Sequence, residues 1–316
     1  MPYSFTERTP LEAGFEAVFH ERIVPVLERR EAERGTLRDR AVSAMGLTGA
    51  LGAGGLGSGL ALDYEAVGVA AGVFGGMGAI ASRSHYESRW QSGLGEKIVP
   101  VLCDFLGDMR HGRQEIDLAP FESLGVIPAH DRATLEDPVS GWHHEARWAM
   151  AEATLVRRVR RRRRRRSRTV FRGLLFRIRT LNPAPRIYFA RDRGGLVNWV
   201  SESLSPTRAG MQKIHVPEEE FERIYEIYTD DVPAALDYIG PEVVSGLKAI
   251  AAEEGRAGSY IGCAFEGDWF YLALPRRADF LSLGSLFRPA HDIEDDLHRA
   301  LSDLDLPRRM IDRMSG

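Results

Sequence analysis

Two long stretches without a charged residue constrain this chain more than any other feature. Residues 41–62 carry no charge over 22 positions and residues 66–82 carry none over 17, with Asp63-Tyr64-Glu65 between them. A helix of about 20 apolar residues crosses a hydrocarbon core of about 30 Å, and only a helix satisfies its own backbone polar groups in lipid. We therefore predict a transmembrane helical hairpin over residues 41–82.

Glycine is frequent in both runs, and its spacing bears on how the helices pack. Gly55 and Gly59, Gly68 and Gly72, and Gly72 and Gly76 are each four residues apart, the spacing that lets membrane helices approach closely. The two helices are expected to pack on each other or on a second copy. A buried hairpin in a soluble helical domain is the alternative, but each glycine costs a soluble helix about 1 kcal/mol relative to alanine.

The segment Gly52 to Gly57 also matches the G-x-G-x-x-G pattern of dinucleotide-binding folds. That pattern requires a preceding strand, a following helix and an acidic residue about 20 positions later. Here it lies inside an uncharged run. We therefore expect no nucleotide cofactor.

Charges beside the hairpin predict its orientation. The arginines that flank the two runs are Arg29, Arg30, Arg34, Arg38, Arg40, Arg83 and Arg89, whereas the connecting turn holds only acids. Positive charge collects on the cytoplasmic side of membrane helices, so both termini are expected in the cytoplasm.

The rest of the chain divides by pattern into three further parts. Residues 1–40 predict an amphipathic cytoplasmic helix that Pro25 should bend, residues 83–119 a helical stalk, and residues 120–316 a cytosolic domain. The sequence Ile-Val-Pro-Val-Leu occurs at residues 23–27 and again at residues 98–102. We expect these two copies to pack against each other beside the membrane.

Residues 120–316 combine strand and helix signals. The predicted strands are residues 142–156, 169–180, 186–190, 196–200 and 222–228, with a β-hairpin over residues 259–274 that turns at Glu266-Gly267-Asp268. Helical patterns follow Asp231, break at Gly240-Pro241, and return near residues 292–304. Neighbouring strands joined by short turns favour an α+β fold with a mainly antiparallel sheet and packed helices.

A run of arginines interrupts this domain between residues 157 and 168. Because like charges repel and stay solvated, we expect a solvated loop that joins two strands. Such a segment gains about 1 kcal/mol per arginine near anionic lipid, and nucleic acid offers a similar field. The membrane tether and the lack of interleaved aromatic residues favour lipid over nucleic acid. The candidate lipid contacts are Arg157, Arg158, Arg160, Arg161, Arg162, Arg163, Arg164, Arg165, Arg166 and Arg168.

The sequence contains only weak signals for catalytic or metal-binding sites. Residues 143–145 (His-His-Glu) have metal-ligand types, but neighbouring residues of a strand point to opposite faces, so no metal site is expected there. No feature of the sequence indicates that the nearby carboxylates line one cleft. These carboxylates are Glu136, Asp137, Glu145 and Glu152. The sequence contains no G-x-S-x-G, P-loop or H-E-x-x-H pattern, which favours a binding protein over an enzyme.

Several segments, taken in order, resemble the bacterial domain-of-unknown-function family 3137. A basic N-terminal helix and a two-helix hairpin are followed by residues 135–141 (LEDPVSG), a strand ending in Glu152 and a variable loop. An F-x-G-L-x-F strand then matches residues 171–176, and an F-x-x-x-F-x-V-Y-x-x-D segment resembles residues 221–231, with Tyr225 at the second phenylalanine. The resemblance implies a membrane anchor and an α+β domain in a bacterial inner membrane. The family has no established activity, so it implies no catalytic residues.

Together these features predict a membrane protein with two spans whose cytosolic domain binds or scaffolds a protein partner or anionic lipid headgroups. No cofactor is expected, and the glycine-rich helices could also pair two chains. The candidate binding residues are Glu136, Asp137, Gly141, Phe171, Gly173 and Phe176. The alternatives are a membrane-bound enzyme that uses the carboxylates of residues 136–152, and a nucleic-acid binder that uses the arginine run. A pocket lined by two or more of those carboxylates would favour the enzyme.

Overall fold

A computed structural model describes residues 3–61, 64–161, 164–191, 210–222, 225–254 and 262–315. These residues form two units. Unit 1 comprises Met1–Phe105 with Leu281–Ser302, and unit 2 comprises Leu106–Phe280 with Asp303–Gly316. The sequence placed the start of one continuous C-terminal domain near residue 120. The structure instead begins unit 2 at Leu106 and assigns residues 281–302 to the N-terminal helices.

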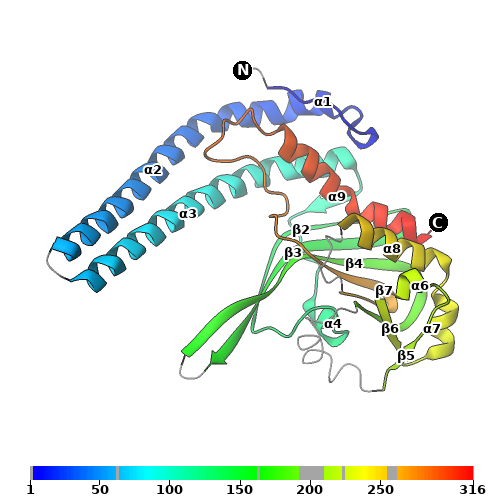
Figure 1. Cartoon of the computed structure of the whole chain (residues 1–316). Coiled ribbons are helices and arrows are strands. Elements are labelled where there is room, and N and C mark those ends of the chain that lie inside the picture. Colours follow the sequence, from blue (N-terminus) through cyan, green and yellow to red (C-terminus); the bar gives the residue numbers. More distant parts are fainter. Residues whose placement is uncertain are drawn as a thin grey trace. The chain divides into compact units, whose positions relative to one another are not determined.

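Two long helices make up most of unit 1 and run side by side in opposite directions (Figure 1). In chain order, the elements of the N-terminal part are η1 (Pro10–Glu12), α1 (Phe15–Val18), η2 (Phe19–Ile23), α2 (Val24–Ala61) and α3 (Glu65–Leu106). The π-helical turn η2 ends two residues before Pro25, where the missing proline N–H removes one hydrogen bond from the helix. The predicted entry helix, uncharged runs and stalk are therefore parts of two continuous helices.

The repeated Ile-Val-Pro-Val-Leu motif lies at one level of this helical pair. Arg22 contacts Asp104 at 2.8 Å on one side of it, and Arg30 Nη1 donates to the carbonyl of Gly93 at 2.9 Å on the other. Between these contacts Ile23, Leu27, Ile98 and Leu102 are all fully buried. The two copies thus supply the apolar contact that the repeat predicted.

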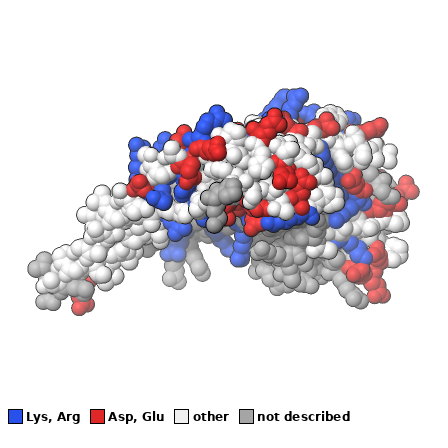
Figure 2. Space-filling view, turned by 90° about the horizontal axis from the view of Figure 1, so that it is seen from above, with Lys and Arg blue, Asp and Glu red and all other residues white. Residues whose placement is uncertain are grey.

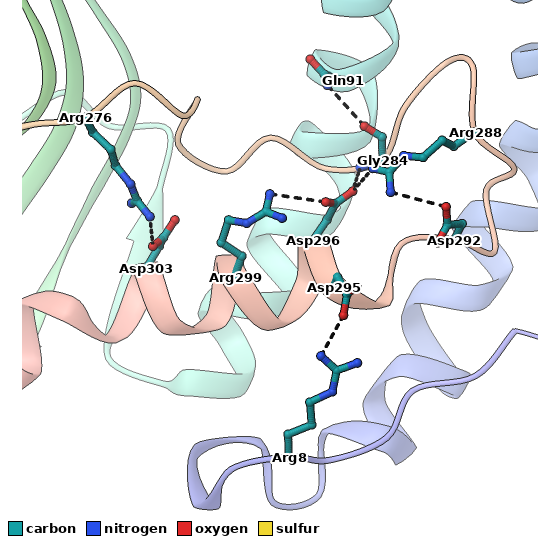
Figure 3. Close-up of polar contacts among 10 residues, drawn as sticks. All are labelled: Arg8, Gln91, Arg276, Gly284, Arg288, Asp292, Asp295, Asp296, Arg299 and Asp303. Atoms are coloured by element: carbon teal, nitrogen blue, oxygen red, sulfur yellow. Dashed lines mark hydrogen bonds and ion pairs between the residues drawn. The ribbon is translucent and has the colours of Figure 1, made fainter. Parts of the chain in front are cut away.

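Asp296, near the start of α9 (Glu294–Ser315), organises the segment that returns to unit 1 (Figure 3). Its buried carboxylate accepts a hydrogen bond from the Gly284 backbone at 3.0 Å and pairs with Arg288 at 2.8 Å and Arg299 at 3.4 Å. The Gly284 carbonyl accepts in turn from Gln91 on α3, at 3.3 Å. These contacts fix residues 281–302 to α3.

Unit 2 contains an antiparallel sheet whose described strands follow the order β1-β2-β3-β4-β6-β5, with β7 also paired to β4 (Figure 1). The strands are β1 (Met109–His111), β2 (Arg132–His143), β3 (Ala146–Arg161), β4 (Arg164–Arg191), β5 (Gln212–Ile214), β6 (Tyr225–Thr229) and β7 (Gly262–Pro275). Strand β4 is central, because β3, β6 and β7 each pair with part of it. The chain is therefore α+β with an antiparallel sheet, as the sequence predicted.

Three strand predictions were wrong: residues 142–156 contain the turn between β2 and β3, residues 169–180 and 186–190 belong to the single strand β4, and the β-hairpin does not form. Residues 262–275 form the single strand β7 along β4, not a β-hairpin that turns at Gly267. Gly267 has φ of +58°, yet it lies at an irregularity in the pairing: Arg179 faces Trp269 and Ala184 faces Gly267. Residues 180–183 of β4 bulge opposite this point, so the glycine accommodates a bend instead of a turn. The predicted strand at residues 196–200 lies outside the described residues.

Both faces of the sheet are covered within unit 2 (Figure 1). On one face lies the segment with α4 (Leu118–Ser123), where Phe121 packs edge-on against Tyr271 at 5.1 Å between ring centroids. On the other face lie α8 (Pro241–Glu254) and the end of α9. These two helices are so close together that a Cβ on Gly246 of α8 would lie 3.1 Å from the carbonyl oxygen of Arg313 on α9. The remaining helices are α6 (Glu219–Glu222), α7 (Val232–Tyr238) and α8 (Pro241–Glu254), and the predicted break at Gly240-Pro241 separates the last two.

Candidate membrane-contacting and ligand-binding sites

The uncharged half of the α2–α3 hairpin has its large apolar side chains on the outside. They are 54–72 % exposed, and the set is Val42, Leu47, Leu51, Val67, Val69, Val73, Phe74, Met77 and Ile80. The far end of this arm carries no blue atoms in Figure 2, and red ones occur only at its tip. A helical pair that folds in water turns such side chains toward its partner. In the α2–α3 hairpin these side chains instead point away from the partner helix.

Glycine fills the seam between the two helices. A Cβ on Gly59 would lie 2.4 Å from the Cα of Gly68, and a Cβ on Gly75 would lie 2.4 Å from the Cα of Gly52. The backbones therefore touch at two levels one above the other, as small-residue spacings allow. Gly76, which the spacing had also selected, meets nothing within 4 Å. The G-x-G-x-x-G segment lies in this part of α2, without the strand and turn that a dinucleotide site needs.

Replacing a seam glycine should weaken the hairpin, whereas replacing an outward glycine should not. We expect Gly59→Ala to lower the free energy of unfolding of the hairpin by about 1–3 kcal/mol, because its Cβ overlaps Gly68. Gly57→Ala is the matched control, since nothing lies within 4 Å of that position. Thermal unfolding of the reconstituted chain measures both. Equal effects of the two substitutions would contradict the close backbone contact.

One helix of the described chain is long and apolar enough to cross a membrane. It is α3, and 6 % of its most apolar 18-residue stretch is buried inside the protein. The described part of α2 does not meet the same test, because glycine lowers its hydrophobicity and its first half is charged. This finding indicates membrane association by length and composition.

A cavity of about 540 Å³ lies between α2 and α3, next to the uncharged runs, where charged residues begin on both helices. Three guanidinium groups line it, from Arg30, Arg40 and Arg89, together with two carboxylates. The Arg30 side chain is 13 % exposed, stacks over Trp90 at 5.3 Å and leaves its buried Nε without a hydrogen-bond partner. The cavity thus brings three guanidinium groups together just outside the uncharged runs.

The arginine run forms a two-stranded ribbon and not the loop that the sequence predicted. The ends of β3 and β4 pair residue by residue, from Arg157 opposite Arg168 to Arg161 opposite Arg164. The backbone of Arg158 donates to Asp131 at 2.6 Å. The sequence argument considered only repulsion between side chains, whereas the backbone pairs here satisfy each other and leave the side chains outside. Arg162 and Arg163 lie outside the described residues.

Arginine occupies both faces of this ribbon. Alternation puts Arg157, Arg166 and Arg168 on one face, and Arg158 with the backbone positions of Arg160 and Arg165 on the other. Among the side chains described, those of Arg158, Arg166 and Arg168 are exposed. Like charges directly opposite one another destabilise a β pair. The ribbon is thus a surface on which an anionic partner would relieve repulsion.

The predicted acidic residues meet at one place on β2 and β3. Glu136 faces Glu152 across the two strands, and Asp137, with φ of +47°, lies in the bulge beside them. Glu152 accepts from the Phe280 backbone at 2.8 Å and pairs with Arg172 at 3.3 Å. Burial raises the pKa of Glu152, and the nearby Asp137 charge adds to that effect. Because Glu152 is held by two partners, its role is to anchor the chain at Phe280.

The other four candidate residues are explained by packing. Phe171 and Phe176 are buried in the sheet. A Cβ on Gly173 would lie 2.0 Å from the Leu274 carbonyl, and one on Gly141 would lie 2.4 Å from the Asp108 carbonyl. These glycines are required where strands and turns approach too closely for a side chain. The structure therefore does not bring the six candidates into one site.

Two of the cavities on the described part of unit 2 are lined by other residues than Glu136, Asp137 and Glu152. The smaller, of about 290 Å³, lies where Arg177 stacks on Trp269 at 3.6 Å. The larger, of about 630 Å³, has both polar and apolar side chains in its lining and lies between β4, α7, α8 and the end of α9. These two cavities therefore give no support to an enzyme built on those carboxylates.

The turn between β2 and β3 brings two histidines to one carboxylate. His143 Nε2 and His144 Nε2 lie 2.7 and 3.1 Å from Oδ1 of Asp312 on α9. The argument that neighbouring residues point apart was wrong here, because His144 lies in the turn with φ of +50° and not in the strand. The sequence offered no signal for Asp312, which lies 168 residues further along the chain.

Comparison with known proteins identifies a family for the second half of the chain. Residues 169–315 match the model of a family described as protein of unknown function (DUF3137). Over these residues the chain belongs to the DUF3137 family. The resemblance inferred from the sequence is thereby confirmed for a region that runs from β4 to α9 and includes the F-x-G-L-x-F strand.

Other comparisons add little to the DUF3137 assignment. No curated protein matches the chain. A crystal structure of the mycobacterial trehalose monomycolate transport factor A, TtfA, is similar at 10% identity and a TM-score of 0.28, and the match covers 64% of this chain and 88% of that one. A similarity at that TM-score carries no argument about fold or function.

Proposed function

We propose that the protein is an integral membrane protein whose α2–α3 hairpin crosses the bilayer twice and holds unit 2 on the cytoplasmic side as a binding or scaffolding domain. The observation that carries this proposal is the reversed packing of the hairpin, with glycine in the seam and large apolar side chains outside. In water that surface is unfavourable. In lipid each outward side chain gains roughly 1 kcal/mol.

Charges at the ends of the uncharged runs support the orientation. Arg40 precedes the first run and Arg83 and Arg89 follow the second, whereas Glu65 starts α3 beyond the turn. Positive charge on the side that leads to both termini supports a cytoplasmic location for both of them. The cavity of Arg30, Arg40 and Arg89 would then lie at the level of the lipid headgroups, where a phosphate could occupy it.

The arginine ribbon supports an anionic lipid surface as the first partner of unit 2. Each arginine near such a surface gains about 1 kcal/mol, and the gain falls off within a Debye length. Tethering by the hairpin raises the effective concentration of headgroups around unit 2. The ribbon would thus bind the same membrane that holds the hairpin, and repulsion between its arginines would be relieved.

Labelling of single cysteines tests the topology. The two native cysteines should not react, because both are buried and burial raises the pKa of Cys103 to about 12 and that of Cys263 as well. Tyr64→Cys places a thiol at the exposed tip, and Glu7→Cys places one at the N-terminal end. In intact cells a membrane-impermeant maleimide should label Cys at position 64 and spare position 7.

Extraction completes this test. Membranes from the same cells, washed at alkaline pH, should retain the protein in the pellet, because only spans inserted in lipid resist such a wash. Labelling of both positions or of neither in intact cells, or release of the protein by the wash, would refute the two-span topology. Lysed cells, in which both thiols should react, provide the control for reagent access.

A further inference from the structure

Asp312 brings two imidazoles to a single carboxylate oxygen. The rings of His143 and His144 lie 4.2 Å apart between centroids, and both turn Nε2 toward the same Oδ1 atom. For that oxygen to accept two hydrogen bonds, both rings must carry hydrogen on Nε2. With the hydrogen of each ring on Nδ1 instead, both Nε2 atoms would present lone pairs, and a metal ion could bind these two nitrogens and the carboxylate oxygen at once.

The backbone is strained to produce this arrangement. His144 takes φ of +50° in a two-residue turn, a conformation that glycine adopts freely and other residues seldom do. An outlier of this kind costs on the order of 1–3 kcal/mol and is often found where side chains are positioned for binding. Without it, the side chain of His144 would point away from that of His143. The strained residue therefore serves to bring the second imidazole to Asp312.

The spacing of the three atoms fits a small divalent ion. Their ligand atoms all lie within 4.8 Å of one another, and among the residues the structure describes no other group of three such ligands does so. Zinc bonds of about 2.0–2.2 Å in a tetrahedron hold ligand atoms roughly 3.3 Å apart. From its present 2.7 Å, His143 Nε2 would move away from the carboxylate oxygen by about 0.6 Å, and His144 Nε2, now at 3.1 Å, by about 0.2 Å.

Nearby cations do not oppose a bound ion, because the described ones have partners of their own. Arg309 pairs with Asp305 at 3.1 Å, one helical turn away on α9. Arg308 donates to the carbonyls of Leu106, at 2.8 Å, and Gly107. Asp305 lies on the same side of α9 as Asp312, seven residues before it and close to His143, and the charges of Asp305 and Arg309 offset each other there.

We propose that His143, His144 and Asp312 form a binding site for a divalent transition-metal ion, with Zn²⁺ as the best-fitting ion. Three protein ligands leave the fourth tetrahedral position for water or for an incoming ligand. Two imidazoles exclude Mg²⁺ and Ca²⁺, which prefer oxygen. The bound ion would cross-link the β2–β3 turn to the last turns of α9, both within unit 2.

Metal titration of the full-length, untagged chain in detergent tests this site. After chelator treatment, the wild-type protein should bind one equivalent of Zn²⁺, and bound Co²⁺ should show the visible absorption of a tetrahedral site. His144→Ala and Asp312→Asn should each weaken Zn²⁺ binding by more than tenfold, since even the loss of an outer partner of a metal ligand costs 10–100-fold. Both side chains are exposed, so neither change should unfold unit 2.

His215→Ala is the matched control. His215 also contacts a carboxylate, that of Glu222 at 2.9 Å, but this pair has no third ligand within the described residues. Its substitution should leave Zn²⁺ affinity unchanged. The proposal is overturned if the wild-type chain binds no Zn²⁺, or if His144→Ala and Asp312→Asn bind it as tightly as the wild type does. Circular dichroism of each variant separates a lost ligand from a lost fold.

Discussion

Leu51→Arg combined with Phe74→Arg should release the protein from the membrane. The two side chains are 67% and 72% exposed and lie near the middle of the two uncharged runs. An arginine at the centre of a membrane helix costs about 2.5–3.5 kcal/mol on the insertion scale, so the pair costs about 6 kcal/mol. A hairpin diluted by glycine has little insertion free energy to spare. We expect most of the protein in the soluble or aggregated fraction after an alkaline wash.

The same pair of substitutions distinguishes a membrane hairpin from a hairpin in water. On a water-facing surface each change would alter the free energy of unfolding by about 0.5 kcal/mol or less. Leu51→Phe with Phe74→Leu conserves hydrophobicity and should stay in the membrane. Leu236→Arg, at an exposed leucine of α7 in unit 2, controls for the added charge. Full retention of the Leu51→Arg, Phe74→Arg variant in the washed membrane would argue against insertion.

Neutralising the exposed ribbon arginines should greatly reduce binding of unit 2 to anionic lipid. The triple change Arg158→Gln, Arg166→Gln and Arg168→Gln removes three charges, at about 1 kcal/mol each. The chain, reconstituted in neutral phosphatidylcholine nanodiscs, should then bind free phosphatidylserine vesicles about a hundredfold more weakly than the wild type. The difference should shrink as salt is added, because salt screens exposed charges.

Arginine-to-lysine substitutions at the same three positions give the matched control. They keep the charge, so binding to phosphatidylserine vesicles should change little. Vesicles of phosphatidylcholine alone should bind neither protein. Equal binding of the glutamine and lysine variants would show that the ribbon does not contact lipid, and a loss confined to DNA binding would assign it to nucleic acid.

The sequence predicted the parts of the fold that depend on one repeated property. Uncharged runs, broken at Asp63-Tyr64-Glu65, were sufficient to predict the hairpin of α2 and α3, and the duplicated motif at residues 23–27 and 98–102 predicted where those helices touch. Both signals are local. Neither requires knowledge of a partner far along the chain.

Features that depend on distant partners could not be predicted. Gly267 resembles a hairpin turn until β4 supplies the bulged segment opposite it, and the arginine run resembles a loop until β3 and β4 are seen to pair. The role of Asp312 depends on a turn formed 168 residues earlier. Of the chosen site residues, Phe171 and Phe176 proved to be core positions, because a buried phenylalanine and a binding phenylalanine have the same sequence pattern.

Unit 1 can be completed only when most of the chain has been synthesised. Gly284 packs against Leu94 and Trp90 of α3, yet residue 281 follows residue 105 by roughly 175 positions. A ribosome that adds about 5–20 residues per second needs roughly 10–35 s to cover that distance. The N-terminal helices therefore leave the ribosome long before their own partner segment, and the long α2–α3 pair must wait without it while most of unit 2 is made.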